Sequence, residues 1–145
     1  MGLMKRSNFA ILILGIVGMV DAGYLSWAKL VNTVIVCASG FGDCNSVNNS
    51  SYAELYGIPV AYLGFLSYFI ISVLATIVIQ KKREIFWITY LIFGITLVGL
   101  LFSGYLTYIE LAVLDAICFY CVISAILMVI LFVISLYKTV KLLNN

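Results

Sequence analysis

Long apolar stretches alternate with short polar segments along the sequence. The apolar stretches cover approximately residues 8–29, 58–79, 85–107 and 117–137. Each is close to the roughly 20 residues that an α-helix needs to cross the hydrocarbon core of a bilayer. The pattern therefore predicts an all-α integral membrane protein, in which residues 1–145 form one domain built as a bundle of four transmembrane helices. The polar segment between the first two spans is expected to cap one end of the bundle as a loop or short helix.

The connections between the spans refine this arrangement. Residues 80–84 join the second and third spans and allow only a tight reversal, which predicts an antiparallel hairpin. Pro59 is expected in the first turn of the second span, because an N–H there would have no partner within the helix. Lys5 and Arg6 precede an apolar run that continues to about residue 30, which is typical of a membrane anchor rather than a cleaved signal peptide.

The charged residues are few and unevenly placed. The chain is 65% hydrophobic and 10% charged, whereas a soluble domain carries about 25% charged residues. On the four-span arrangement one side holds Lys5, Arg6, Lys81, Lys82, Arg83, Lys138 and Lys141, and the other holds Lys29. Because short cytoplasmic loops retain cations, we expect a multi-pass protein of the cell membrane with both termini cytoplasmic. Membrane lipid is an expected partner, and a net charge of +2 is too small to indicate nucleic acid.

Histidine is absent, so four cysteines carry most of the remaining redox or nucleophilic chemistry. The lack of imidazole excludes Ser/His and Cys/His catalysis, zincin-type sites and histidine-ligated haem. The cysteine spacing is poor for a zinc or copper site, and no metal is expected. All four cysteines fall in segments predicted to be extracytoplasmic, where disulfides persist.

Cys118 and Cys121 form a C-x-x-C motif where the fourth span is predicted to begin. Residues three apart share a helix face, so the two sulfurs can bond. The unpaired N–H groups and the positive dipole end of a helix N-terminus favour the Cys118 thiolate, the reactive form in thiol–disulfide exchange. The motif suggests a redox-active pair, and the alternative is a static pair of thiols among packing residues.

Cys37 and Cys44 lie in the segment after the first span, with Gly40 and Gly42 between them. The glycines supply the backbone freedom that a short disulfide ring needs. The simplest interpretation is a structural disulfide. A second pair on the same side favours a relay instead, in which the loop pair carries electrons from a soluble thiol protein to the C-x-x-C pair. Four cysteines allow three pairings, and a relay needs at least two of them to form in turn.

Residues 44–64, with the sequence CNSVNNSSYAELYGIPVAYLG, resemble the vitamin K epoxide reductase family. The order of motifs along the chain also resembles that family. A loop cysteine pair is followed by a serine several residues later, by Gly-Ile-Pro before the second span, and by C-x-x-C at the start of the fourth span. The resemblance covers about residues 8–137. The DsbB-type thiol oxidases also have four spans and two cysteine pairs, but their C-x-x-C pair comes first.

The resemblance implies a bundle around a quinone, with electrons passing from a reduced thioredoxin-fold partner through the loop pair to the C-x-x-C pair. By position in the motifs, Cys37 would exchange with the partner and Cys44 would attack Cys118. Cys121 would face the quinone. Many bacterial relatives carry a fused thioredoxin-like domain, and because this chain ends at Asn145 the expected partner is a separate, DsbA-like protein.

The resemblance also implies residues around the cysteines and the quinone. Ser50 would be the polar residue beside the active cysteines, with Ser51 as the alternative one position away. The residues expected near the quinone are Val60, Tyr62, Gly64, Phe119 and Ala125. Val60 and Ala125 stand where animal relatives have quinone-bonding asparagine and tyrosine, so recognition of vitamin K epoxide of the animal type is not expected. The cofactor would be a quinone of the menaquinone, ubiquinone or vitamin K type.

The resulting hypothesis is a membrane thiol–disulfide oxidoreductase that oxidises its partner, reduces a quinone and supports disulfide formation. One alternative is a quinone or vitamin K epoxide reductase whose product is the reduced cofactor, and another is a non-catalytic four-span scaffold. The sequence leaves the roles of three carboxylates open. Asp21 lies within the first span, where intramembrane carboxylates are functional hypotheses. Glu110 and Asp115 lie near the extracytoplasmic end, and solvation there is the favoured interpretation.

Overall fold

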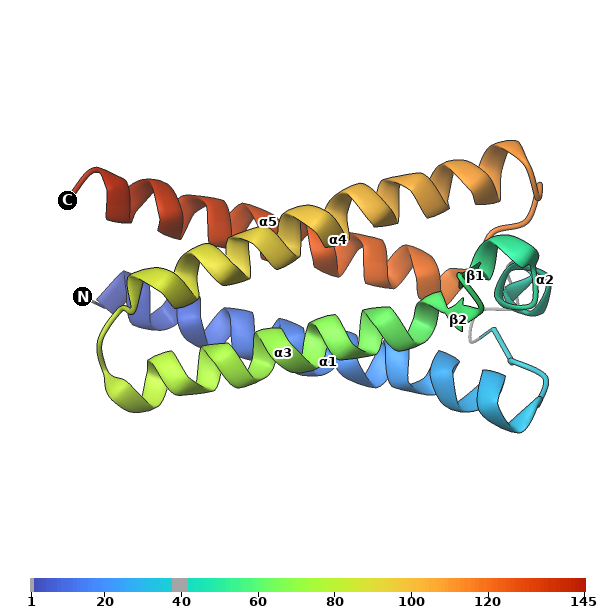
Figure 1. Ribbon diagram of the computed structural model, residues 1–145, viewed down its shortest axis with the longest axis horizontal. Coiled ribbons are helices and arrows are strands. Elements are labelled where there is room, and N and C mark those ends of the chain that lie inside the picture. Colours follow the sequence, from blue (N-terminus) through green and yellow to red (C-terminus); the bar gives the residue numbers. More distant parts are fainter. Residues whose placement is uncertain (1, 38–41) are drawn as a thin grey trace.

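The computed structural model describes residues 2–37 and 42–145, so that Gly40 lies outside the described residues. Within those ranges, four helices are long and apolar enough to cross a membrane. They are α1 (Gly2–Val31), α3 (Val60–Lys81), α4 (Phe86–Ala112) and α5 (Phe119–Leu143), and they run side by side along the long axis (Figure 1). The predicted all-α membrane bundle is confirmed, with each helix extending at least two residues beyond its predicted C-terminal end.

Short elements between α1 and α3 cap the end of the bundle opposite the two termini (Figure 1). They are α2 (Cys44–Asn48), a 3-10 turn η1 (Ser51–Ala53), β1 (Glu54–Leu55) and β2 (Ile58–Pro59). The strands pair antiparallel, with Leu55 opposite Ile58. Pro59 therefore ends β2 and is the N-cap of α3. The helix begins one residue later, at Val60, so Pro59 precedes the first turn in which it was expected.

The closest helix packing joins α1 to α3 and α4 to α5, rather than the two helices of the α3–α4 hairpin. Glycines on α1 explain the close packing of α1 against α3. A Cβ atom on Gly18 would come within 2.3 Å of the Tyr68 ring, and a Cβ atom on Gly15 would come within 2.5 Å of Ser72 Oγ. Small residues at helix interfaces let the backbones approach in this way. The reversal after α3 lies where predicted, with Lys82 in the left-handed region at φ 51°.

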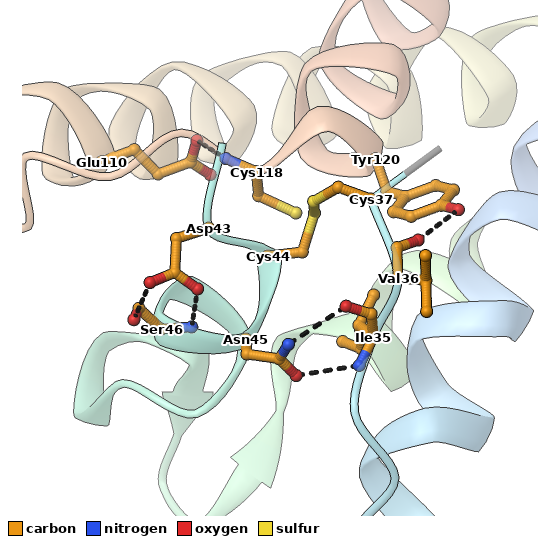
Figure 2. The surroundings of a disulfide bond; sticks show 10 residues. All are labelled: Ile35, Val36, Cys37, Asp43, Cys44, Asn45, Ser46, Glu110, Cys118 and Tyr120. Atoms are coloured by element: carbon orange, nitrogen blue, oxygen red, sulfur yellow. Dashed lines mark hydrogen bonds between the residues drawn. A yellow bond between two sulfur atoms is a disulfide. The ribbon is translucent and has the colours of Figure 1, made fainter. Parts of the chain in front are cut away.

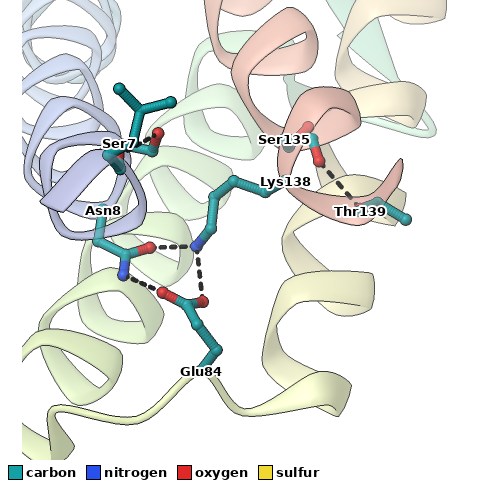
Figure 3. Close-up of polar contacts among 7 residues, drawn as sticks. Ser7, Asn8, Glu84, Ser135, Lys138 and Thr139 are labelled. Atoms are coloured by element: carbon teal, nitrogen blue, oxygen red, sulfur yellow. Dashed lines mark hydrogen bonds and ion pairs between the residues drawn. The ribbon is translucent and has the colours of Figure 1, made fainter. Parts of the chain in front are cut away.

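A buried polar cluster closes the end of the bundle near the termini (Figure 3). The Lys138 ammonium donates to Asn8 and lies 3.0 Å from Glu84 Oε2, while Asn8 Nδ2 donates to Glu84 Oε1 at 2.6 Å. We name these three residues, from α1, the α3–α4 connection and α5, the terminal clasp. Lys138 is only 1% exposed. The sequence pattern groups Lys138 with the cations expected on the cytoplasmic side, whereas the structure shows it as an internal ion-pair partner.

Candidate functional site

The cap holds a disulfide between Cys37 and Cys44, whose Cα atoms are 6.2 Å apart. Cys44 is the first residue of α2, whose N-cap is Asp43. The Asp43 side chain accepts hydrogen bonds from the backbone N–H and the hydroxyl of Ser46. Those bonds lower the pKa of Asp43, chiefly through the Ser46 hydroxyl. The capped helix thus gives Cys44 a defined position, which is buried.

The same segment is bound directly to the backbone that precedes the C-x-x-C motif. Asp43 N–H donates to the carbonyl of Ile117 at 3.0 Å. Gly42 has φ +88°, and a Cβ there would come within 2.1 Å of the Ile117 carbonyl oxygen. Glycine is thus required by conformation and by contact, a stronger reason than the ring flexibility inferred from sequence. Because Ile117 adjoins Cys118 and Asp43 adjoins Cys44, this contact joins the segments that carry the two cysteine pairs.

Two further contacts hold the other arm of the cap. The Asn45 side-chain amide exchanges hydrogen bonds with the backbone of Ile35, accepting at 2.9 Å and donating at 3.0 Å. Tyr120, from the first turn of α5, donates to the carbonyl of Val36 at 3.1 Å. The arm that leads into Cys37 is therefore anchored twice, at Ile35 to α2 and at Val36 to α5 (Figure 2).

Cys118 is the N-cap of α5 and Cys121 lies in its first turn, as the motif predicts. Both are free thiols in the described structure. Figure 2 shows the Cys118 side chain directed at the Cys37–Cys44 disulfide, and Cys118 and Cys44 belong to one buried cluster. The sequence-predicted neighbours Cys37, Cys44, Cys118 and Cys121 are thus brought together at the junction of cap and bundle.

The surroundings of Cys118 favour its thiolate. The pKa of Cys118 is lowered, first by the hydrogen bond from the Cys121 thiol and then by the N–H groups of Cys121 and Tyr120. Burial and the nearby Glu110 carboxylate oppose that shift. The helix N-terminus therefore contributes as its position predicts, while the larger contribution comes from the second thiol. A thiolate at Cys118 beside a disulfide is the arrangement needed for exchange.

Glu110, near the end of α4, connects this site to the bundle. Its Oε2 accepts the backbone N–H of Cys118 at 3.2 Å, and its side chain is 4% exposed. Solvation at the interface, the interpretation favoured from the sequence, is therefore wrong for Glu110. The link after α4, residues 113–118, folds back and buries this carboxylate against the start of α5. Asp115, in contrast, is exposed.

A cavity of about 680 Å³ extends from Cys121 into the bundle between the two helix pairs. Leucine, isoleucine and other apolar side chains form most of its lining. Polar groups are contributed by Cys121, Glu110, Asp21, Tyr68 and Ser124. A mostly apolar cavity of this size with a few polar groups is typical of a small-molecule or cofactor site.

The residues that the resemblance places near a quinone divide into two groups. Val60 and Gly64 line the cavity, as does Ser50, whose hydroxyl donates to the Val47 carbonyl at 2.8 Å. Tyr62, Phe119 and Ala125 are not part of the lining formed by the described residues. Phe119 instead packs against the buried cysteine cluster.

Sequence reasoning missed Tyr68 and Ser124. The Tyr68 hydroxyl donates to the Ser124 carbonyl at 2.9 Å and lies 2.9 Å from Ser124 Oγ, which bridges α3 and α5 inside the cavity. The spacing of Gly15 and Gly18 signals a close helix approach, but it does not identify the side chain that fills the space. That side chain is Tyr68, on a helix 50 residues away in sequence from Gly18.

Comparison with known proteins agrees with this geometry. The family model described as "Vitamin K epoxide reductase family" matches residues 9–136. The Arabidopsis thaliana protein "Thiol-disulfide oxidoreductase LTO1" is 34% identical over 133 residues, which cover 86% of this chain and 34% of that relative. The chain therefore spans about a third of the length of that protein. Such similarity supports a redox function, and the match over most of the sequence shows that this chain belongs to the vitamin K epoxide reductase family.

Proposed function

We propose that this protein is a membrane thiol–disulfide oxidoreductase that oxidises a thioredoxin-fold partner and passes the electrons to a membrane quinone. The observation that carries the proposal is the placement of Cys118. Its thiol faces the Cys37–Cys44 disulfide on one side, while Cys121 of the same motif lines the cavity on the other (Figure 2). A scaffold protein has no need for a dithiol placed against a disulfide, so this placement favours the enzyme.

The proposed exchange conserves thiols and disulfides at each step. A reduced partner dithiol attacks the Cys37–Cys44 disulfide through Cys37 and leaves as a disulfide, so that Cys37 and Cys44 become thiols. Cys44 then attacks Cys118 of an oxidised Cys118–Cys121 pair and expels the Cys121 thiolate. Attack of Cys37 on Cys44 restores the loop disulfide and leaves Cys118 and Cys121 as thiols. The described structure corresponds to this last state.

Reoxidation of the Cys118–Cys121 dithiol releases two electrons and two protons, which a quinone accepts when it is reduced to a quinol. The cavity fits such a group because its lining is mainly apolar and Cys121 contributes to it. Glu110 and the N-terminal N–H groups of α5 hold the two thiols at the cavity. Quinones are generally stronger oxidants than protein disulfides, so the downhill direction makes disulfides. We propose a quinone of the menaquinone, ubiquinone or vitamin K type.

The termini and the cap lie at opposite ends of the bundle (Figure 1). We propose that the cap and its cysteines are extracytoplasmic and that both termini are cytoplasmic, because the exposed Lys81, Lys82 and Arg83 lie at the end with the termini. Tyr56→Cys, at a site 98% exposed in the cap, should react with an impermeant maleimide added outside intact cells. Lys82→Cys should react only after permeabilisation, and the reverse pattern would contradict this orientation.

The direct test uses purified protein in lipid nanodiscs with a reduced DsbA-like protein as electron donor. We expect quinol absorbance to appear together with partner disulfide, in a one-to-one ratio, when menaquinone or ubiquinone analogues are supplied. Cys121→Ser should abolish quinol formation, whereas Asp115→Asn, which changes an exposed carboxylate, should retain it.

The alternatives give other outcomes in the same assay. Absence of quinol with every quinone type, with all four cysteines locked in unchanging bonds, would leave the scaffold interpretation. Reduction of vitamin K epoxide at a rate exceeding that of the quinones would indicate a reductase whose product is the cofactor.

A further inference from the structure

The cavity contains a second carboxyl group that the thiol chemistry does not use. Asp21, in the third quarter of α1, lines the same cavity as Cys121. Its Oδ2 atom is buried and has no hydrogen-bond partner among residues 2–37 and 42–145. A buried polar atom without a partner is destabilising, because it has lost its hydrogen bonds to water. Such an atom at the wall of an apolar cavity points to a ligand that completes its hydrogen bonding.

Several other polar groups of the cavity already have hydrogen-bond partners. Glu110 accepts the Cys118 N–H, and its side chain interacts with Cys121. The Tyr68 hydroxyl is bonded to Ser124, and the Ser67 hydroxyl donates to the Leu63 carbonyl. Among the described lining residues, Asp21 is thus the carboxyl group that remains free to bind a ligand.

The position of Asp21 is set by the packing of α1 on α3. Gly18 lies one turn before Asp21 and receives the ring of Tyr68, so that this face of α1 turns toward the cavity. Ala22 beside Asp21 lies 3.8 Å from the Cβ position of Gly64, which keeps the two helices close. The carboxyl is therefore carried by a rigid helix pair, while Cys121 belongs to α5.

A para-quinone has two ring oxygens, and each is protonated when the quinol forms. We propose that Asp21 hydrogen-bonds the ring oxygen that does not face Cys121 and Glu110, and thereby positions the quinone in the cavity. The inference rests on the proposed function, because it assigns a residue to the quinone of that function. It also explains how this chain holds a quinone although Val60 and Ala125 are apolar. Asp21 is thus a positioning residue. Its carboxyl group donates a hydrogen bond to the carbonyl oxygen of the quinone and accepts one from the hydroxyl group of the quinol.

The test measures binding rather than turnover. The dissociation constants of menadione and ubiquinone-1 are determined by equilibrium dialysis against protein in nanodiscs. We expect Asp21→Leu to weaken binding about tenfold, which corresponds to about 1.4 kcal/mol and is typical of one hydrogen bond. Asp21→Asn retains a donor and should bind within about threefold of the wild type. Asp115→Asn is the control, because it removes an exposed carboxylate.

A spectroscopic readout covers the case in which Asp21→Leu does not fold. Infrared difference spectra of wild-type protein should show a shift of a carboxyl C=O band when quinone binds. The shift should be lost in Asp21→Asn and kept in Asp115→Asn. Unchanged affinity in Asp21→Leu, or a band shift that persists in Asp21→Asn, would overturn the assignment while leaving quinone use intact. Failure of the wild type to bind any quinone would overturn the proposed function and this inference together.

Discussion

The thiol of Cys118 and the disulfide sulfur of Cys44 lie in one buried cluster, although 74 positions separate the two residues in the sequence. Cys118 is fully buried and Cys44 is 1% exposed. The proposed exchange between them would take place inside this cluster, away from solvent. The cap therefore holds the Cys37–Cys44 disulfide against the start of α5. The proposed electron transfer between the two cysteine pairs would occur there.

The proximity of Cys118 and Cys44 predicts a trapped intermediate. In Cys121→Ser, the Cys118 thiolate can attack Cys44 and release Cys37, and the resulting bridge can no longer be attacked by Cys121. We expect a Cys44–Cys118 disulfide in peptide maps under non-reducing conditions, with Cys37 free to hold a partner in a mixed disulfide. Cys118→Ser is the matched control and should keep the Cys37–Cys44 bond. Finding only Cys37–Cys44 in the Cys121→Ser protein would contradict the relay.

The charge of Glu110 should tune this reaction. Its carboxylate raises the pKa of Cys118, so Glu110→Gln should lower that pKa while keeping an oxygen that accepts the Cys118 N–H. In the Cys121→Ser background, we expect the pH midpoint for formation of the Cys44–Cys118 bridge to move to lower pH, because the thiolate is present at lower pH. Stopped reactions quenched with acid and mapped by mass spectrometry measure the midpoint. A midpoint that stays or rises would show that Glu110 acts only through the backbone.

Gly42 should be necessary for docking of the cap. Gly42→Ala adds about 1–2 kcal/mol of backbone strain at positive φ and a clash with the Ile117 carbonyl. We expect the contact to separate, the melting temperature in detergent to fall and Cys118 to become reactive toward maleimide. Gly57→Ala is a close control, because Gly57 has φ +82° but open space around its Cβ position. If both variants exposed Cys118 equally, strain rather than the Ile117 contact would be responsible.

The terminal clasp should stabilise the bundle without affecting the cysteines. Lys138→Met leaves the partly buried Glu84 carboxylate without its cation, and removal of one partner from a buried pair costs roughly 3–5 kcal/mol. We expect a lower melting temperature in detergent and an unchanged pattern of disulfides. Combining Lys138→Met with Glu84→Gln should recover part of the loss, because the unpaired charge is gone. Lys141→Met, one turn further along α5, is the control, and an equal loss in that variant would argue against the clasp.

The bundle could be predicted because its signals are local. Apolar runs of spanning length must form helices in lipid, since backbone groups have no water to bond there. The C-x-x-C motif could likewise be placed at a helix N-terminus, because it lies where the fourth apolar run begins. The cap was less predictable: β1 and β2 are two residues each, and their turn depends on positive φ at Tyr56 and Gly57.

What the sequence by itself determined is the set of membrane spans, the family resemblance and the two cysteine pairs that form the candidate site. Only the tertiary structure decided which groups meet. Glu110 is buried at Cys118 because the chain folds back after α4, and Asp21 shares a cavity with Cys121 because α1 packs on α3 and leaves space toward α5. Lys138 is internal because three distant segments converge on it. Such contacts depend on the relative placement of whole helices, which residue patterns within one helix do not encode.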